Sequence, residues 1–301
     1  MKRLIWYSVF FITCSIGIFL FILSFADGYT DPFYIRFTAP QQGNIIVGSS
    51  RSAQGLLPSV FSKELERKFY NFSFTMTHSP FGPVYYNFIE NSVLDTVKNG
   101  IFIVSVEPWS ISNNGKNPND STQFVENDLP LAKVKSRSYK PNFEYLLKTL
   151  TGKYYTVISN KNRKTFLHDD GWLEISVSMD SISQKNRFDE KMMSYRTKNF
   201  PGRKLSHVRL QYLVKTIQFL KKHGKVFLVR LPISSELYQL EQQLMPNFNQ
   251  IIHTAIQESN GYWDMTNENI SYQYTDGNHL WKESGKKVST KIARWIKEKS
   301  R

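Results

Sequence analysis

The sequence predicts an α/β protein with three layers, α/β/α, around a parallel sheet of about five strands, preceded by one transmembrane helix. Three observations lead to this prediction. Short apolar runs alternate with amphipathic segments through much of the chain. A run of 22 uncharged residues follows the first two cations. The chain has 301 residues, 41% hydrophobic and 21% charged, which suits one large globular domain or two small ones and excludes a wholly disordered chain.

The first segment predicts a membrane anchor. Lys2 and Arg3 precede the uncharged stretch Leu4–Phe25, which as a helix would span roughly 33 Å, enough to cross a bilayer core. The two cations favour a cytoplasmic N-terminus, which places the rest of the chain outside the cytoplasm, periplasmic or extracellular. A signal peptide cleaved after Ala26 is the alternative, but its apolar region is usually only about 7–15 residues long. We therefore expect residues 1–26 to be an uncleaved, single-pass signal-anchor.

The exported part begins with a polar segment and a short buried strand. Residues 27–43 contain Asp, Pro, Gly and Gln and are predicted to be a tether, so the α/β domain would occupy 44–301. Asn44–Val47 is a short apolar run that predicts the first strand. Gly48-Ser49-Ser50 follows it, and these small residues permit a sharp turn into a helix that begins near Arg51.

The alternation of strands and helices continues to the C-terminus, with one interruption. Apolar spacing predicts further strands at 70–74, 101–106, 226–231 and 262–265, and helices at 85–97, 208–222, 235–244, 249–257 and 284–299. The stretch from about 107 to 206 does not follow this alternation. We expect it to be an elaboration at one edge of the sheet.

The charge indicates an anionic partner. The net charge is +14, from 39 basic and 25 acidic residues, and from Lys133 to Lys164 nine basic residues accompany one acidic residue, Glu144. This basic run would contact anionic lipid headgroups or an acidic polymer, or form a solvated face; the sequence leaves these open. A nucleic-acid partner would need a cytosolic domain, so none is expected. The single cysteine, Cys14, excludes a disulfide framework and a cysteine-based zinc site.

Residues suited to nucleophilic catalysis lie near both ends of the domain. Ser49 and Ser50 follow the first strand, and ligands of open parallel sheets bind at the carboxyl ends of the strands. Asp276 and His279 are three positions apart in a turn that Gly277 allows to be tight, so the carboxylate can orient the imidazole. A serine needs such an oriented base to become a nucleophile. The structural alternative is a turn serine and a C-terminal capping cluster.

These two blocks resemble those of the SGNH (GDSL-type) hydrolase and acyltransferase superfamily. Its first block, a strand followed by Gly-Asp-Ser, is similar to Gly48-Ser49-Ser50, and its last, Asp-x-x-His before a terminal helix, to Asp276-Gly277-Asn278-His279. The resemblance spans about residues 44–110 and 205–299 and implies a flavodoxin-like fold. It implies Ser50 as nucleophile, His279 as base and Asp276 as orienting group, with Ser49 as the alternative nucleophile. The N-terminal anchor and Val106-Glu107-Pro108-Trp109 look most like the DltD-like, membrane-anchored branch.

The oxyanion hole implied by the resemblance is only partly matched. The family supplies a glycine and an asparagine in addition to the serine backbone. The Ser50 N–H carries over directly, and Gly82 is the candidate glycine. Asn113 and Asn114 lie too far past the preceding predicted strand to serve as the asparagine. The loss of one such donor can cost about 10²–10³ in rate.

Two arginines and one histidine are candidates for substrate contacts. Arg51 and Arg230 lie next to predicted strand ends and would bind an anionic group of the substrate. A structural ion pair is the alternative for each. His78 would line the site or lie in a surface loop.

The sequence and the resemblance together predict a serine esterase or O-acyltransferase that acts on acyl esters, preferably acetyl esters, of an envelope glycan or polymer. The resemblance implies a membrane-bound O-acyltransferase as a partner. No metal and no organic cofactor is expected, since the histidines lack metal-ligand spacing. The alternative is a non-catalytic envelope protein of the same fold that binds a membrane O-acyltransferase or an anionic polymer.

Overall fold

The centre of the molecule is a five-stranded parallel sheet. The computed structural model describes residues 1–75, 79–150, 152–158 and 164–300. The spatial strand order is β2-β1-β3-β8-β9, the order of flavodoxin-like doubly wound sheets. The strands are β1 (Ile45–Val47), β2 (Tyr70–Asn71), β3 (Gly100–Ser105), β8 (Gly224–Arg230) and β9 (Tyr262–Asp264). Ile46 pairs with Asn71 on one side and Ile103 on the other, so β1 and β3 mark the point where the strand order reverses. The predicted fold class is confirmed.

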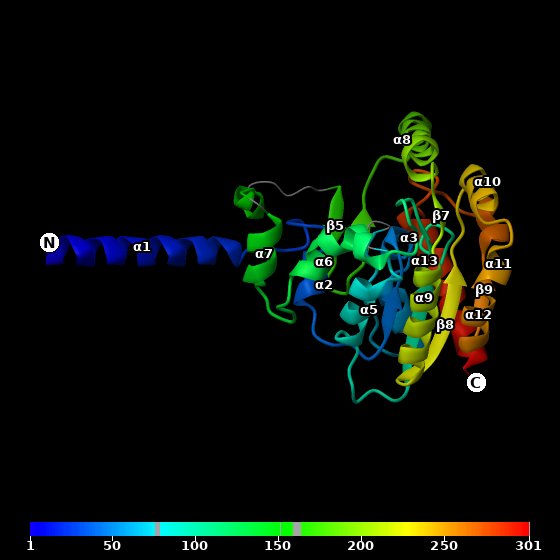
Figure 1. Ribbon diagram of the computed structural model, residues 1–301, viewed down its shortest axis with the longest axis horizontal. Coiled ribbons are helices and arrows are strands. Elements are labelled where there is room, and N and C mark those ends of the chain that lie inside the picture. Colours follow the sequence, from blue (N-terminus) through cyan, green and yellow to red (C-terminus); the bar gives the residue numbers. More distant parts are fainter. Residues whose placement is uncertain (76–78, 151, 159–163, 301) are drawn as a thin grey trace.

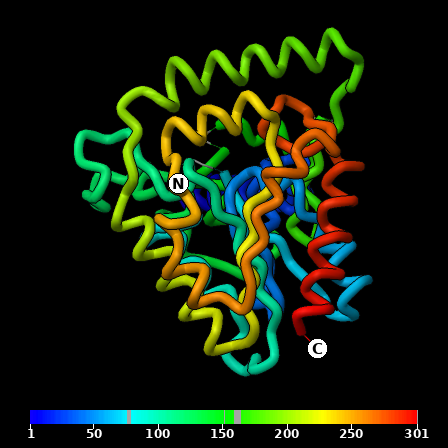
Figure 2. Tube along the Cα trace, turned by 90° about the vertical axis from the view of Figure 1, so that its right-hand side faces the viewer, coloured from blue at the N-terminus to red at the C-terminus, as the bar shows by residue number. Residues whose placement is uncertain are grey.

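Helices cover both faces of this sheet (Figure 1). Alternate strand residues point to opposite faces, so Phe102 and Val104 join one hydrophobic core while Ile101 and Ile103 join the other. Figure 2 shows α9 and α13 on opposite sides, with α8 across the top. The first core is covered by α5 (Pro83–Glu90), α9 (His207–Lys221), α11 (Phe248–Ile251) and α12 (His253–Glu258), and the second by α4 (Pro58–Leu65) and α13 (Lys282–Lys299). The short helix α3 (Ser50–Gly55) contributes Ala53 to the first core.

Two predicted helices are shorter than their apolar spacing suggested. The predicted helix 85–97 ends as α5 at Glu90, because the Ser92 hydroxyl donates to the Phe88 carbonyl and Val93 pairs with Gln42 beside the sheet. The predicted helix 249–257 is divided into α11 and α12, with Ile252 at the junction.

The region from 107 to 206 adds no strand to the central sheet among its described residues. Its described residues form two antiparallel pairs, β4 with β7 and β5 with β6, and three α-helices. Its elements are β4 (Ser112–Asn113), α6 (Pro130–Lys133), α7 (Phe143–Thr149), β5 (Thr165–Leu167), β6 (Leu173–Ile175), α8 (Ser181–Ser194) and β7 (Lys204–Leu205). After this region, α10 (Ser235–Leu244) follows β8.

The predicted tether at 27–43 is corrected by the structure. Within it, α2 (Tyr34–Thr38) is buried along its whole length, and Arg36 donates to the carbonyls of Asn71 and Gly171. The polar residues on either side suggested a linker, but the aromatic side chains between them pack into the first core. This segment is therefore part of the packed domain.

The first helix, α1 (Lys2–Leu23), is long and apolar enough to cross a membrane by its length and composition. It stands out from the rest of the chain as an isolated rod (Figure 1). Its side chains are exposed up to Ile18, whereas Leu23 and nearby Ala26 are buried in the first core. An N-terminal helix of this kind is consistent with a single-pass anchor.

Candidate active site

The first half of the site is the sharp turn from β1 into α3. A side chain at Gly48 would overlap the Ser52 hydroxyl and the Cβ of Ser105, so only glycine fits where the strand ends. The buried Ser49 caps α3, because its hydroxyl accepts a hydrogen bond from the Arg51 N–H at 3.3 Å. Ser50 is the first residue of α3 and is partly exposed. Of the two serines, Ser50 therefore has the hydroxyl that is free of a capping role.

The second half is the turn that precedes α13. Tyr274 and Leu280 pair across it, and Gly277 has φ +81°, a left-handed conformation that favours glycine. One Asp276 carboxylate oxygen accepts hydrogen bonds from the backbone N–H groups of Asn278 at 3.0 Å and His279 at 2.9 Å. The carboxylate thus shapes the turn that places it beside the imidazole.

The structure brings these two halves together. His279 Nε2 lies 2.8 Å from Ser50 Oγ, and His279 Nδ1 lies 2.9 Å from Asp276 Oδ2. Ser50 and His279 are 229 positions apart in the chain. The three side chains form one line of hydrogen bonds, from hydroxyl to imidazole to carboxylate.

Asn278 favours one tautomer of the neutral His279 ring in this line. Arg51 Nε donates to Asn278 Oδ1 at 2.9 Å, and because a guanidinium has no acceptor, the amide orientation is fixed by chemistry. The Asn278 Nδ2 group therefore faces His279 Nε2, 3.2 Å away, as a donor. Nε2 accepts, so the ring proton sits on Nδ1 and is donated to Asp276. This is the tautomer in which the imidazole can act as a base toward Ser50.

Helix α8 holds the second turn from outside. Gln184 donates to the Tyr274 carbonyl at 2.7 Å and Arg187 to the Thr275 carbonyl at 2.8 Å. Lys191 lies 3.1 Å from Asp276 Oδ2. Burial alone would raise the pKa of the Asp276 carboxyl, but His279 and Lys191 outweigh burial and hold that pKa well below its ordinary value. Asp276 is therefore ionised across the neutral range.

Arg51 and Arg230, the arginines predicted to bind substrate, are both held in buried ion pairs. Both arginines are buried, and each lies 2.7 Å from a carboxylate oxygen of Glu241. Glu241 is itself buried in α10, so one carboxylate joins two guanidinium groups beneath the site. Arg230 also lies 3.4 Å from Asp264. The structural ion pair, the alternative to substrate binding, is thus the arrangement present for both arginines.

A second buried carboxylate lies after β3. Burial raises the pKa of Glu107, while Arg51 and the Ser49 side chain act to lower it. Glu107 therefore connects the loop after β3 with the turn that carries Ser50.

The predicted oxyanion donors have different surroundings. The Ser50 N–H is the first amide of α3, where intrahelical acceptors are absent. Gly82 lies against the Glu126 carboxylate and the Arg209 guanidinium, and no hydrogen bond among the described residues joins it to Ser50, Asp276 or His279. The structure therefore gives no support to Gly82 as a donor. His78 lies outside the described residues.

Sequence reasoning missed Asn278, Glu241 and Lys191. Asn278 lies inside the Asp-Gly-Asn-His block, but only its contact with Arg51 reveals its role. Glu241 did carry a signal, because it shares the buried face of α10 with Leu237 and Leu240. A carboxylate at such a position needs a buried cation as partner. Lys191 belongs to the region that the strand–helix alternation did not cover.

The described residues contain no group of three or more His, Cys, Asp or Glu side chains arranged to hold a metal ion. The chemistry that the arrangement itself can perform is proton transfer from a serine hydroxyl to an imidazole that a carboxylate orients.

Comparison with known proteins gives little further guidance. No protein-family model and no curated protein matches the sequence. Among solved structures, the chain is similar to the inhibitor-bound form of an aryl esterase of M. Smegmatis, with 9% sequence identity and a TM-score of 0.36. That match covers 86% of this chain and 99% of the other. A TM-score this low carries no argument about function, so function has to be argued from the site itself.

Proposed function

We propose that this protein is a membrane-anchored serine esterase or O-acyltransferase of the SGNH type, whose domain lies outside the cytoplasm. The observation that carries the proposal is the hydrogen-bonded line of Ser50, His279 and Asp276 at the carboxyl end of β1, with 2.8 Å between hydroxyl and imidazole. The position matches the edge at which ligands of doubly wound sheets bind.

The proposed reaction has two half-steps. His279 Nε2 takes the Ser50 proton while Oγ bonds to the acyl carbon; the C–O bond of the ester then breaks, and the leaving alcohol takes the proton from the imidazolium. A water or a second hydroxyl gives its proton to His279, attacks the acyl-serine and releases Ser50 Oγ, which recovers the proton. The Ser50 N–H stabilises the oxyanion in both half-steps.

The substrate class is the finer part of the proposal. An acyl ester, preferably acetyl, on an envelope glycan or polymer follows from the sequence resemblance together with the membrane helix. A membrane-bound O-acyltransferase as partner rests on the same resemblance.

A fluorophosphonate probe tests the nucleophile on the full chain. We expect the wild type to be labelled, Ser50→Ala to lose labelling, and His279→Ala to lose about 10²-fold or more in labelling rate, because the hydroxyl loses its base. Ser59→Ala, an exposed serine on α4, is the matched control and should label like the wild type.

Two outcomes would overturn this assignment. Labelling that persists in Ser50→Ala but disappears in Ser49→Ala would move the nucleophile to Ser49. A folded wild type that is not labelled would favour the alternative function, a non-catalytic envelope protein that binds an acyltransferase or an anionic polymer.

A further inference from the structure

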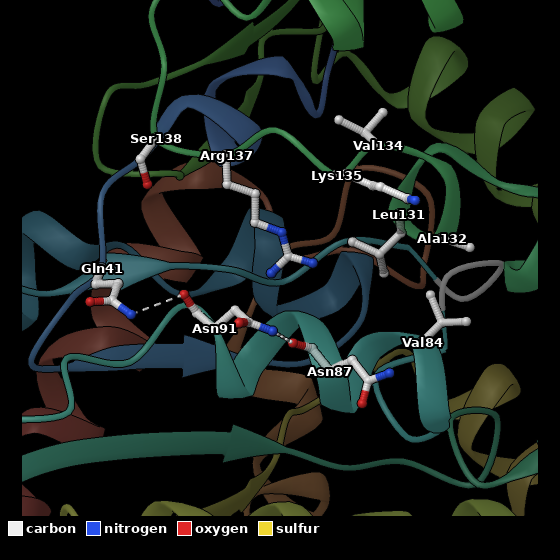
Figure 3. A pocket seen from close by; sticks show the side chains of 10 residues that line it. All are labelled: Gln41, Val84, Asn87, Asn91, Leu131, Ala132, Val134, Lys135, Arg137 and Ser138. Carbon is white, nitrogen blue, oxygen red and sulfur yellow. Dashed lines mark hydrogen bonds between the residues drawn. The ribbon is translucent and has the colours of Figure 1, made fainter.

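A cavity of about 530 Å³ lies between α5 and the segment 131–138 (Figure 3). It shares no lining residue with the hydrogen-bonded line at Ser50 or with the Glu241 ion pairs. Its polar lining includes Arg137 and Lys135 on one side, and on the other Asn87 of α5 and Asn91, which caps the end of that helix. The cavity is therefore separate from the proposed active site.

Arg137 is the central cation of this cavity. Its guanidinium lies over the Phe88 ring, 4.4 Å from the centroid, and Nη1 donates to the Phe88 carbonyl at 2.9 Å. Its side chain extends toward α5 in Figure 3. Burial lowers the pKa of Arg137 to about 10. The contacts with Phe88 hold the guanidinium in place. No other hydrogen bond joins it to a described residue, so Nε and Nη2 are available to a ligand.

Unlike Arg51, Arg230 and Arg209, the half-buried Arg137 has no carboxylate partner among the described residues. Arg36 has none either, but its guanidinium donates to the carbonyls of Pro32, Asn71 and Gly171. Arg51 and Arg230 lie on Glu241, and Arg209 lies 2.6 Å from Glu126. Among the described residues, no carboxylate lies within ion-pair distance of Arg137. A partly desolvated cation without a counter-charge is costly, and an anion from outside the chain would remove that cost.

The rest of the lining adds positive charge and hydrogen-bond donors. Lys135 brings a second cationic side chain to the cavity. The nearby Glu144 carboxylate is already engaged by the backbone N–H groups of Lys135 and Ser136 and by Lys148. No hydrogen bond among the described residues uses the side-chain amide of Asn87, so this group is available to a ligand.

We propose that this cavity binds a phosphate ester. The Arg137 guanidinium would hold two phosphate oxygens, Lys135 would neutralise the remaining charge, and Asn87 would donate to a third oxygen. The volume exceeds what an isolated ion needs, since a water molecule takes about 30 Å³ in the liquid. Val84 and Leu131 give the alcohol part of the ester an apolar wall.

Calorimetry with glycerol 3-phosphate tests the site on the full chain in detergent micelles. We expect the wild type to bind and Arg137→Gln to bind about tenfold more weakly or worse, because two charge-assisted hydrogen bonds are lost. Lys133→Gln is the matched control: it removes one positive charge from the same segment, but its exposed side chain does not line the cavity. Absence of binding by the wild type, or an equal loss in Lys133→Gln, would overturn the proposal.

A second variant separates binding from folding. Asn87→Asp places a carboxylate in the cavity, where it would act as an internal counter-ion to Arg137. We expect this variant to lose glycerol 3-phosphate binding while its melting temperature rises. Binding at wild-type affinity in Asn87→Asp would overturn the proposal, and neither result depends on whether Ser50 reacts with the fluorophosphonate.

The same experiment in nanodiscs identifies the source of the phosphate. If lipid headgroups occupy the site, phosphatidylglycerol discs will weaken glycerol 3-phosphate binding severalfold relative to phosphatidylcholine discs. If the ligand is a soluble ester, the two affinities will agree. In both kinds of disc, the affinity of the wild type for glycerol 3-phosphate is compared with that of Arg137→Gln. Either result therefore requires that the cavity binds the ester through Arg137.

Discussion

Asp276 performs two tasks with one carboxylate. It accepts the backbone N–H groups that close the turn and it orients the His279 ring. The carboxylate is mostly buried but remains charged, because the imidazole and Lys191 lower its pKa. A single side chain therefore links the stability of the turn to the geometry of the proposed base.

This link predicts a specific pH dependence. Because the pKa of Asp276 is lower in the folded state, its ionised form stabilises the fold above the ordinary carboxyl pKa of about 3.9, and this stabilisation is lost as the pH falls toward the folded-state value. Asp276→Asn should therefore lower the free energy of unfolding by about 2 kcal/mol near pH 5.

Urea unfolding of both proteins at a series of pH values checks this prediction. The difference between wild type and Asp276→Asn should shrink steadily below about pH 4. Buried carboxyls with raised pKa values, such as Asp31 and Glu107, occur in both proteins and cancel in the difference. A difference that stays constant down to pH 2 would contradict the prediction.

At the scale of residues, the sequence could predict those whose role shows in a few neighbouring positions. Asp276 and His279 share one turn, and Ser50 follows a strand end, so all three could be selected. The surroundings of Arg51 could not be predicted, because its partner Glu241 is 190 positions away. Whether a cation at a strand end faces substrate or a buried carboxylate depends on that distant contact.

At the scale of elements, α8 and the turn at Gly277 fit closely against each other. A Cβ on Gly277 would lie 2.6 Å from a ring carbon of Phe188 on α8, and its φ is +81°. Gly152 has almost the same backbone conformation, φ +83°, but a Cβ there would meet nothing within 4 Å. The two glycines separate the effect of packing from that of backbone strain.

We expect Gly152→Ala to cost about 1–2 kcal/mol of unfolding free energy from left-handed strain alone. Gly277→Ala should cost about 1–3 kcal/mol more, because its methyl group overpacks against Phe188. Urea unfolding measures both losses, and fluorophosphonate labelling should slow only in Gly277→Ala. Equal losses in the two variants would show that α8 does not press on the turn.

Element boundaries followed the sequence where capping and apolar spacing agree. Ser206 caps α9, which begins one residue before the predicted start. The predicted helix beginning at Tyr85 was too long because Val93 continues the apolar spacing but belongs to a bridge with Gln42. Apolar spacing records which residues are buried, and both helices and irregular segments can bury them.

At the scale of the whole molecule, the fold class could be predicted because a doubly wound sheet repeats one local pattern. The prediction of a tether at 27–43 failed because composition does not show where aromatic side chains go. The rings of Tyr34 and Phe37 pack at a tilt against Tyr145 of α7, far along the chain. As a result, α1, α2 and α7 form one packed unit.

This packing predicts which face of the domain meets the lipid. The ring centroids of Phe19 on α1 and Tyr154 lie 5.1 Å apart. The Tyr154 hydroxyl donates to the Leu147 carbonyl at 3.5 Å. The exposed Leu147 should therefore lie at the bilayer surface when α1 spans the bilayer. Ile270, also exposed and apolar, lies on the 3₁₀ turn Thr266–Ser271 and is the matched control.

Collisional quenching measures this difference in the full chain. In a Cys14→Ser background, Leu147→Cys and Ile270→Cys are each labelled with a fluorophore and reconstituted in vesicles that contain spin-labelled lipid. The label at 147 should be quenched severalfold more than the label at 270. Equal quenching would mean that the domain does not rest on the bilayer through α7.

The burial of Leu23 and Ala26 has one more consequence. A domain joined to its membrane helix by a flexible linker can reach targets at many distances from the membrane. Because Leu23 and Ala26 join α1 to the domain without a flexible linker, a membrane that α1 spans would hold the proposed active site at one height and in one orientation. We therefore expect the distance of a substrate's ester from the membrane to decide whether it can reach Ser50.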